Sequence, residues 1–121
     1  MLFDVERTPL AGRPALTVRG ELDLAAAPHF AAAVDAALAD GARALVVDLT
    51  PTTFLDSSGA RELVRIARQA TAADVDLHVV APRSNAAVRL TVDLLDLGSI
   101  VPIVTSASDI PTGLTGRDAG T

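Results

Sequence analysis

The sequence predicts an α/β fold, in which a mixed sheet of about five strands is packed with helices in the order β-β-α-β-α-β-α-β. Short apolar runs typical of buried strands alternate with longer segments in which apolar residues recur at helical spacing. Glycine or proline stands between most of these segments. The chain has 121 residues, of which 50% are hydrophobic, so it is long enough for one domain with its own core.

The N-terminal part of the chain is predicted to form a β-hairpin. Residues 2–6 alternate weakly between apolar and polar side chains, and residues 15–20 show the same period of two. The turn between them is marked by Pro9, Gly12 and Pro14. The first two strands are therefore expected to pair with each other.

A helix followed by a central strand is predicted next. Over residues 28–39 apolar side chains recur at helical spacing, and Gly41 is suited to end the helix. The apolar face of this helix consists of Phe30, Val34, Ala37 and Leu38. Residues 44–49 are nearly all apolar, which is typical of a strand covered on both faces by helices. This strand is expected at the centre of the sheet.

A second helix is predicted over residues 57–71, after a turn at residues 51–53. Its apolar face consists of Ala60, Leu63, Val64, Ala67 and Ala70. Beside that face runs a stripe of three arginines, Arg61, Arg65 and Arg68. Such a stripe is usually a solvated face, and the alternative is a docking edge for an acidic partner.

The last predicted elements are a strand over residues 77–81, a helix over residues 84–97 and a strand over residues 100–104. The helix is expected to bury Val88, Val92 and Leu95, to be capped by Ser84 or Asn85, and to end at Gly98. Pro102 cannot donate a backbone hydrogen bond, so the last strand is expected at an edge of the sheet.

No linker or internal repeat divides the chain, so residues 1–105 are predicted to form a single domain. Beyond Thr105 the pattern fades, and Pro111 and Gly113 disfavour a long helix. Residues 106–121 are therefore expected to be a short or irregular segment that ends in a flexible tail.

The composition excludes several classes of function. The net charge of −5 disfavours a nucleic-acid-binding protein, and the absence of cysteine removes thiolate chemistry and cysteine-based metal sites. No apolar stretch is long enough for a membrane span, and the N-terminus does not resemble a secretory signal, so a cytoplasmic protein is expected. The sequence has no glycine-rich loop of the kind that binds phosphate groups, so no bound cofactor is expected. It also has no apolar pattern that would require a second copy of the chain, so a monomer is expected.

The most informative local feature is the segment Phe54-Leu55-Asp56-Ser57-Ser58-Gly59 at the predicted start of the second helix. Polar side chains there face unpaired backbone N–H groups and the positive end of the helix dipole. One interpretation is plain helix capping, with Gly59 allowing a tight turn. A second is a serine nucleophile, and a third is a phosphorylation site, because a helix N-terminus tolerates a phosphate.

The residues give these interpretations unequal support. A nucleophile is disfavoured because the Gly-x-Ser-x-Gly spacing is absent, and because His29 and His78 lie in a predicted helix and a predicted strand. Both histidines are expected to be structural or surface residues. Phosphorylation would place new negative charge next to Asp56 and weaken the binding of a partner docked there, which would make a binary switch.

A weaker feature is the segment Gly20-Glu21-Leu22-Asp23-Leu24, in which acidic residues follow the second strand. By itself it predicts a loop, in which Asp23 is suited to cap the first helix.

Together these segments resemble the STAS family, the sulfate-transporter and anti-sigma-factor-antagonist domain. The resemblance covers residues 2–105 and is carried by Gly20-Glu21-Leu22-Asp23-Leu24, Leu45-Val46-Val47-Asp48-Leu49 and Phe54-Leu55-Asp56-Ser57-Ser58-Gly59, in this order. Residues 88–98 also resemble the family's segment before the last strand. The resemblance implies a STAS-like fold with about four helices packed on the sheet.

The resemblance also implies a function, an anti-sigma factor antagonist that works by partner switching. The unphosphorylated form would bind an anti-sigma factor that is also a serine kinase, which frees the sigma factor. The kinase would phosphorylate Ser57, the phosphorylated form would let go, and a serine/threonine phosphatase would reset it. The protein would be a substrate and a ligand, not an enzyme.

Individual site residues follow from the same resemblance. Ser58 would flank the acceptor, Asp56 and Gly59 would shape its turn, and Asp23 would line the same partner-facing surface. Arg61 departs from the family's apolar helix start and is expected to affect which partner docks. The alternative within the family is a non-catalytic subunit of another system, either a lipid-transport accessory or a signalling scaffold.

Overall fold

The structure is a computed structural model that describes residues 3–111. Six strands, three α-helices and two short 3₁₀ helices follow one another there. They are β1 (Asp4–Arg7), β2 (Ala15–Leu22), α1 (Ala27–Ala39), β3 (Ala44–Asp48), β4 (Thr52–Leu55), α2 (Ser57–Ala72), β5 (Asp76–Val80), α3 (Ala86–Leu94), η1 (Leu97–Ser99), β6 (Ile103–Val104) and η2 (Ala107–Asp109). The predicted α/β class is confirmed, with one strand more and one α-helix fewer than expected.

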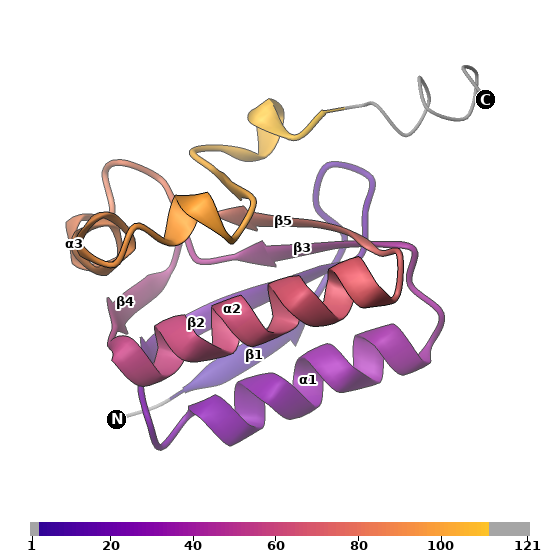
Figure 1. Ribbon diagram of the computed structural model, residues 1–121, viewed down its shortest axis with the longest axis horizontal. Helices are drawn as coiled ribbons and strands as arrows, with labels where there is room; N and C mark the ends of the chain where they lie inside the picture. The colour runs from indigo at the N-terminus through magenta and orange to yellow at the C-terminus, as the bar shows by residue number, and fades with distance from the viewer. Residues whose placement is uncertain (1–2, 112–121) are drawn as a thin grey trace.

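The sheet is organised around β2. It pairs antiparallel with β1 and parallel with β3 and, further along, with β4. The strand order is β1-β2-β3-β5-β6, with β4 beside β2 only (Figure 1). This arrangement confirms three predictions. The first two strands form a hairpin, the strand after the first helix is central, and the last strand lies at an edge of the sheet.

The additional strand, β4, begins inside the turn predicted at residues 51–53: Thr50 and Pro51 do form a turn, but Thr52 and Thr53 belong to β4, so the turn is shorter and earlier than predicted. β3 pairs only with the first part of β2, Ala15–Thr17, and β4 pairs with its last part, Gly20–Leu22. The chain bends after β3 and then resumes pairing along the same strand. A physical reason is that the buried end of β2 would otherwise have unpaired backbone groups.

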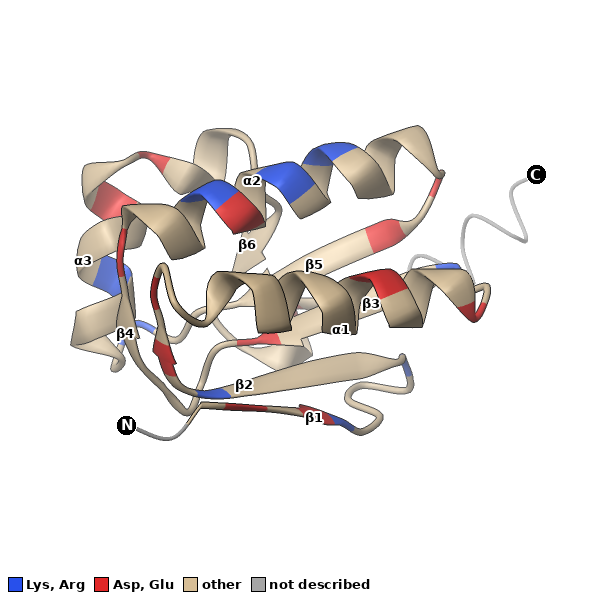
Figure 2. Cartoon of the chain, turned by 90° about the horizontal axis from the view of Figure 1, so that it is seen from below, with Lys and Arg blue, Asp and Glu red and all other residues tan. Residues whose placement is uncertain are grey.

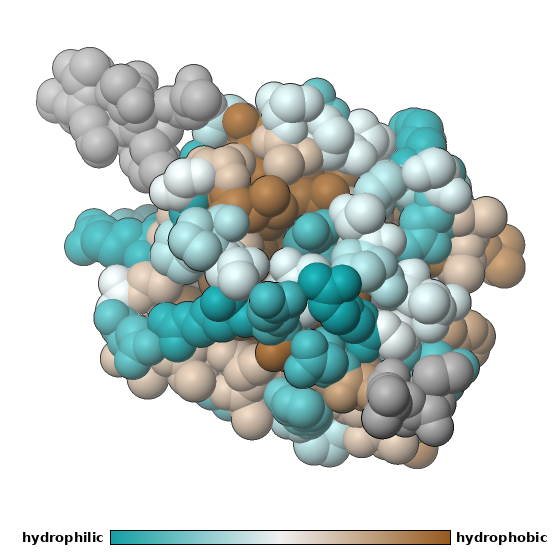
Figure 3. All heavy atoms as spheres, turned by 180° about the vertical axis from the view of Figure 1, so that it is seen from behind, coloured by the Kyte–Doolittle hydropathy of each residue, from teal (hydrophilic) through white to brown (hydrophobic). Residues whose placement is uncertain are grey.

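Helices α1 and α2 lie side by side on one face of the sheet and cover the main apolar cluster (Figure 1). The sequence predicts helices on the opposite face as well, and this is wrong. A smaller cluster of Ala15, Val46, Val80 and Ile110 lies there, packed against by Leu10, Val104 and Ala107. Figure 3 shows this side of the molecule, with apolar atoms at its centre and hydrophilic residues around them. Helix α3 is short and lies beside β4 at one end of the sheet.

Helix α3 is shorter than predicted at both ends. Asn85 rather than Ser84 caps it, because the Asn85 side-chain oxygen accepts a hydrogen bond from Val88 N at 3.3 Å. The helix ends at Leu94, since Asp96 has a left-handed backbone with φ of 50°. Gly98, the expected stop, lies in η1 instead.

Two of the predicted apolar faces also differ in detail. Leu95 is expected in the buried seam of α3 but is 50% exposed, because it lies beyond the last helical turn, and Leu97 is buried instead. In α2, Val64 is only partly buried, and Ile66 completes the buried face. The last strand, expected over residues 100–104, contains only Ile103 and Val104.

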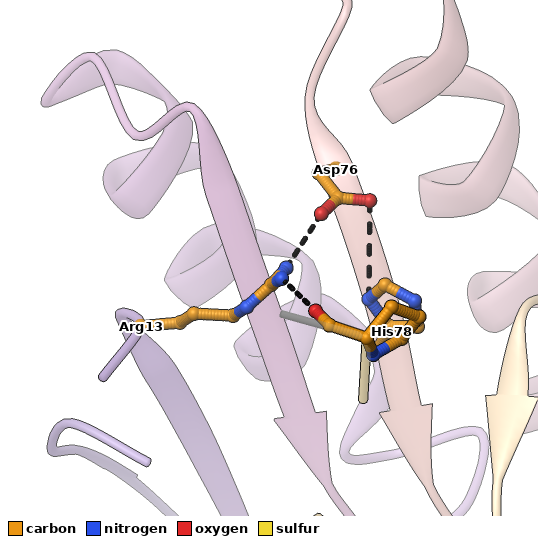
Figure 4. Close-up of polar contacts among 4 residues, drawn as sticks. Arg13, Asp76 and His78 are labelled. Carbon is orange, nitrogen blue, oxygen red and sulfur yellow. Dashed lines mark hydrogen bonds and ion pairs between the residues drawn. The ribbon is translucent and has the colours of Figure 1, made fainter. Parts of the chain in front are cut away.

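Arg13 attaches the segment after β6 to the sheet (Figure 4). Its guanidinium donates to the Asp76 carboxylate at 2.6 Å and to the carbonyl oxygen of Pro111 at 2.7 Å. The Arg13 side chain is 5% exposed and that of Asp76 is 28% exposed, so the cation is shielded from water while the carboxylate is partly exposed. Together with buried Ile110, these contacts hold the end of the described chain against the domain. Residues 112–121, which include the predicted tail, lie outside the described residues.

His78 lies beside this ion pair and is expected to make stability depend on pH. Its Nδ1 is 3.9 Å from the Asp76 carboxylate. Burial lowers the pKa of His78 below its ordinary value, the Asp76 carboxylate opposes this, and the Arg13 cation adds to it. The unfolded chain then binds the histidine proton more tightly than the folded one, so the free energy of unfolding falls as the pH drops below about 6.5.

The control for this prediction is His78→Gln, which cannot take up the proton. Urea unfolding at about pH 7 and about pH 5.5 should show a larger loss of unfolding free energy for the wild type than for the variant. Equal losses in the two proteins would mean that His78 does not couple folding to protonation.

Candidate functional site

The candidate site is the junction at which β4 ends and α2 begins. Asp56 is the N-cap of α2, with an extended backbone, and its side chain accepts a hydrogen bond from Gly59 N at 2.9 Å. The predicted capping role of this segment is thereby assigned to Asp56. Ser57 is the first helical residue and is exposed. Within the described part of the chain, no side-chain hydrogen bond engages its hydroxyl.

Gly59 has a different role from the one that the sequence suggests. Its backbone is helical rather than left-handed, so it does not serve a tight turn. A Cβ atom at this position would lie 2.4 Å from the carbonyl oxygen of Leu22 and 2.7 Å from a methyl carbon of Leu55. The absence of a side chain therefore lets the first turn of α2 pack directly on β2, which fixes the height of Ser57 above the sheet.

Asp23 lies at the same edge of the sheet as Asp56. Leu22 of β2 is the register partner of Leu55 of β4, so the residues that follow them leave the two parallel strands side by side. The Asp23 carboxylate accepts a hydrogen bond from Ala26 N at 3.0 Å. It thus closes the turn before α1, whose N-cap is Ala26 rather than Asp23.

A hollow of about 380 Å³ lies next to this turn. Its lining consists of Phe3, Glu21, Asp23, Ala25, Ala26 and His29. The His29 ring packs edge-on against Phe3, with 5.3 Å between ring centroids. The hollow therefore carries two carboxylates, those of Glu21 and Asp23.

The three arginines of α2 do not form one uniform stripe. Arg65 donates to Glu62 at 2.8 Å and to Gln69 at 3.1 Å, and Gln69 reaches Asp35 of α1. Arg65 therefore belongs to a network that links the two helices. Arg61 and Arg68 are exposed, and Arg61 lies one helical turn after Ser57.

No arrangement for nucleophilic catalysis or metal binding is found among residues 3–111. Neither histidine there hydrogen-bonds to a serine, and no three His, Asp or Glu side chains come together as a metal site. The part of the chain that the structure describes also has no helix long and apolar enough to cross a membrane.

Two side chains on the α3 side, which no sequence pattern connects with the site, bond to the backbone of β4 and of the segment before it. The Asn85 amide donates to the carbonyl oxygens of Leu49 at 3.1 Å and Thr52 at 2.7 Å. The Thr91 hydroxyl donates to the carbonyl oxygen of Leu55 at 2.6 Å. Because these partners are 33 to 36 positions away in the sequence, no local pattern could reveal the contacts.

The fold and the junction define a small α/β domain that presents a serine at a helix start on an open edge. Residues 3–110 match the family model of the STAS domain, and the chain belongs to this family. The family resemblance seen in the sequence is thereby confirmed, and the match continues past residue 105 to Ile110. No curated protein sequence matches the chain.

Solved structures agree with this assignment. A crystal structure of an anti-sigma factor antagonist from Mycobacterium paratuberculosis is 28% identical, with a TM-score of 0.74 over 95% of this chain and 93% of that one. The anti-sigma factor antagonist SpoIIAA in its unphosphorylated form is 18% identical, with a TM-score of 0.60 over 99% and 100% of the two chains. The Bacillus cell fate determinant SpoIIAA in its phosphorylated form is 20% identical, with a TM-score of 0.55 over the same shares. At these identities the two SpoIIAA structures show the fold.

Proposed function

We propose that this protein is an anti-sigma factor antagonist controlled by phosphorylation of Ser57. In its unphosphorylated form it binds a cytoplasmic anti-sigma factor of the serine-kinase type, which releases the sigma factor. A serine/threonine phosphatase returns the phosphorylated form to the binding state. In this role the protein is a ligand and a substrate rather than an enzyme.

The observation that carries the proposal is the exposed Ser57 hydroxyl at the first position of α2. The helix is 16 residues long, so its N-terminus presents unpaired N–H groups and a positive dipole end. A phosphate placed there is tolerated by the folded chain, because it meets partial positive charge. A kinase can reach the hydroxyl without unfolding the domain.

The family and the neighbouring structures support the same role. A neighbour of 28% identity is an anti-sigma factor antagonist, and SpoIIAA has been solved in unphosphorylated and phosphorylated forms. We assign Asp23, Asp56, Ser58, Gly59 and Arg61 to the partner-facing surface. Asp56 and Gly59 shape this surface, while Asp23, Ser58 and Arg61 lie around the acceptor.

The proposal is tested by intact-mass analysis after incubation with ATP and each purified anti-sigma serine kinase of the host. We expect one phosphate from one kinase, located on Ser57 by peptide mapping, and none on Ser57→Ala. The matched control is Ser58→Ala, which removes the neighbouring hydroxyl and should still accept the phosphate. Unmodified wild-type protein with every kinase, or transfer to another residue, would refute the assignment.

A further inference from the structure

The segment that follows β6 lies across the second face of the sheet, and we call residues 105–111 the strap. It contains η2 and Ile110, which is 5% exposed and packs against the smaller apolar cluster of the sheet. Within residues 3–111, the hydrogen bond from Arg13 to the carbonyl oxygen of Pro111 is the only one that joins the strap to the rest of the domain. A segment attached in this way opens at a lower free energy than the core.

The guanidinium of Arg13 is bonded at two places, and we call Arg13 with its two bonds the latch. Its Nη1 donates to the Asp76 carboxylate at 2.6 Å, and its Nη2 donates to the carbonyl oxygen of Pro111 at 2.7 Å. Figure 2 shows the acidic position at the start of β5 and the basic position just before β2 at the same end of the sheet. The Arg13 side chain is 5% exposed, so a strap that lifts away leaves a buried cation with one acceptor fewer. The latch therefore favours the closed strap.

His78 is the titratable group beside the latch (Figure 4). Its Nδ1 lies 3.9 Å from the Asp76 carboxylate and has no hydrogen-bond partner within residues 3–111. Burial lowers the pKa of His78, the Asp76 carboxylate opposes this, and the Arg13 cation adds to it. A protonated His78 would place a second cation beside the guanidinium and compete with it for the same carboxylate. Protonation of His78 therefore acts against the latch.

The other elements described around His78 bring no further charge to it. Its register partner on β3 is Val46, and β6 consists of apolar residues. Further along β3, the Asp48 carboxylate bonds to the turn that follows it. In the strap, the Asp109 carboxylate accepts a hydrogen bond from the Thr105 hydroxyl at 2.8 Å. Within residues 3–111, only the two charges of the latch act on the pKa of His78.

We propose that the strap opens and closes on the folded domain, with Arg13 as its latch and protonation of His78 as the event that releases it. Opening uncovers the smaller apolar cluster, so this switch controls access to the second face of the sheet. It acts on the face opposite to α1 and α2. The inference goes beyond the proposed function and does not depend on the phosphorylation of Ser57.

The direction of the switch follows from the two environments of His78. In the closed form, burial and the Arg13 cation disfavour the charged imidazolium. Lifting the strap admits water to the ring, so its pKa rises toward the ordinary value of about 6.5. Protons then bind more tightly to the open form, so the open fraction rises as the pH drops below about 6.5. Between about pH 7.5 and about pH 5.5, the ratio of open to closed molecules can rise by at most about tenfold.

Amide hydrogen exchange followed by NMR tests the proposal, because the protection factor of an amide reports how rarely its hydrogen bond opens. The reporter is the N–H of Ile110, which donates to the carbonyl oxygen of Ala107 at 3.1 Å. This bond belongs to one short turn, which is not stable away from the domain. The reference is the N–H of Val46, which donates to the carbonyl oxygen of Pro14 at 2.9 Å within the sheet. From about pH 7.5 to about pH 5.5, the protection of Ile110 relative to Val46 should fall about three- to tenfold.

Arg13→Lys tests the latch without removing the positive charge. A lysine has one nitrogen, whereas two different nitrogens of Arg13 bond to the carboxylate and to the strap. At about pH 7.5 the protection of Ile110 should therefore fall at least about fivefold. The matched control is Arg19→Lys, because Arg19 pairs with Glu6 at the exposed surface of the same sheet, about 20 Å along β2 from Arg13. This control should leave the protection of Ile110 unchanged.

His78→Gln tests the trigger, because glutamine cannot take up the proton. In this variant the protection of Ile110 relative to Val46 should be the same at both pH values. If the variant kept the pH dependence of the wild type, His78 would not release the strap. If Ile110 and Val46 lost protection in parallel in the wild type, the strap would open only with the whole domain, and the proposal would be wrong. Unchanged protection in Arg13→Lys would overturn the role of the latch.

Discussion

Gly59→Ala is expected to lower the free energy of unfolding by about 3 kcal/mol, the upper part of the range for overpacked sites. The added methyl group would lie 2.4 Å from the carbonyl oxygen of Leu22 and 2.7 Å from Leu55. Leu22 pairs with Leu55 of β4 and its carbonyl oxygen accepts a hydrogen bond from Asp56 N at 3.4 Å, so it cannot move away alone. Helix α2 must shift instead, which opens the contact between its first turn and β2. Urea unfolding followed by circular dichroism measures the loss.

Gly98→Ala is the matched control for this prediction. A Cβ atom at Gly98 would meet no atom within 4 Å, and the residue does not need a left-handed backbone. Its substitution should change the unfolding free energy by less than about 0.5 kcal/mol. If Gly59→Ala proved as stable as Gly98→Ala, the close packing of α2 on β2 would not be what requires a glycine.

Ser57→Asp is expected to weaken binding of the partner kinase at least about a hundredfold, about 2.7 kcal/mol. The new carboxylate would lie next to Asp56 and would lose its water when the partner docks. A phosphoserine carries more charge, about −1.5 to −2, and should weaken binding further. In the free protein the change should cost little, because a negative charge in the first turn of a helix is favourable. Isothermal titration with the kinase measures the affinity.

Two variants separate charge from size in this experiment. Ser57→Asn has nearly the shape of the aspartate without its charge and should lose much less affinity. Ser57→Ala removes the hydroxyl and should bind like the unphosphorylated protein. Equal losses for the aspartate and asparagine variants would show that bulk rather than charge releases the partner, which contradicts an electrostatic switch.

The two predictions concern neighbouring residues with different tasks. Gly59 holds the start of α2 against the sheet, whereas Ser57 is exposed. Gly59→Ala should therefore lower stability and affinity together, while Ser57→Asp should lower affinity alone. Measuring both quantities on both variants distinguishes a misplaced helix from a changed surface.

Much of the fold follows from local patterns in the chain. Apolar spacing places Phe30, Val34 and Ala37 on the buried face of α1, and the continuous apolar run of β3 marks the central strand. Asp56 is recognisable as an N-cap because a carboxylate before a helix satisfies free N–H groups. These signals act over a few residues, so the sequence carries them directly.

Other features depend on what lies opposite in space. The turn predicted at residues 51–53 ends already at Pro51, because β2 extends past β3 and offers free pairing positions to the residues that follow. The prediction that helices cover both faces of the sheet fails because Ile110 and the residues near it cover the second face instead. Elements that are distant in the sequence determine which part of a strand stays unpaired and which face of the sheet stays uncovered. No local sequence pattern therefore indicates either.

By itself, the sequence determined the α/β class, the order of the elements predicted and the family, through the segments around Asp23 and Ser57. Tertiary structure alone decided that Gly59 serves close packing and that Arg13 ties Pro111 to Asp76. Propensity, capping and periodicity depend on neighbours in the chain. Steric contact, buried ion pairs and surface patches depend on neighbours in space, which only folding brings together.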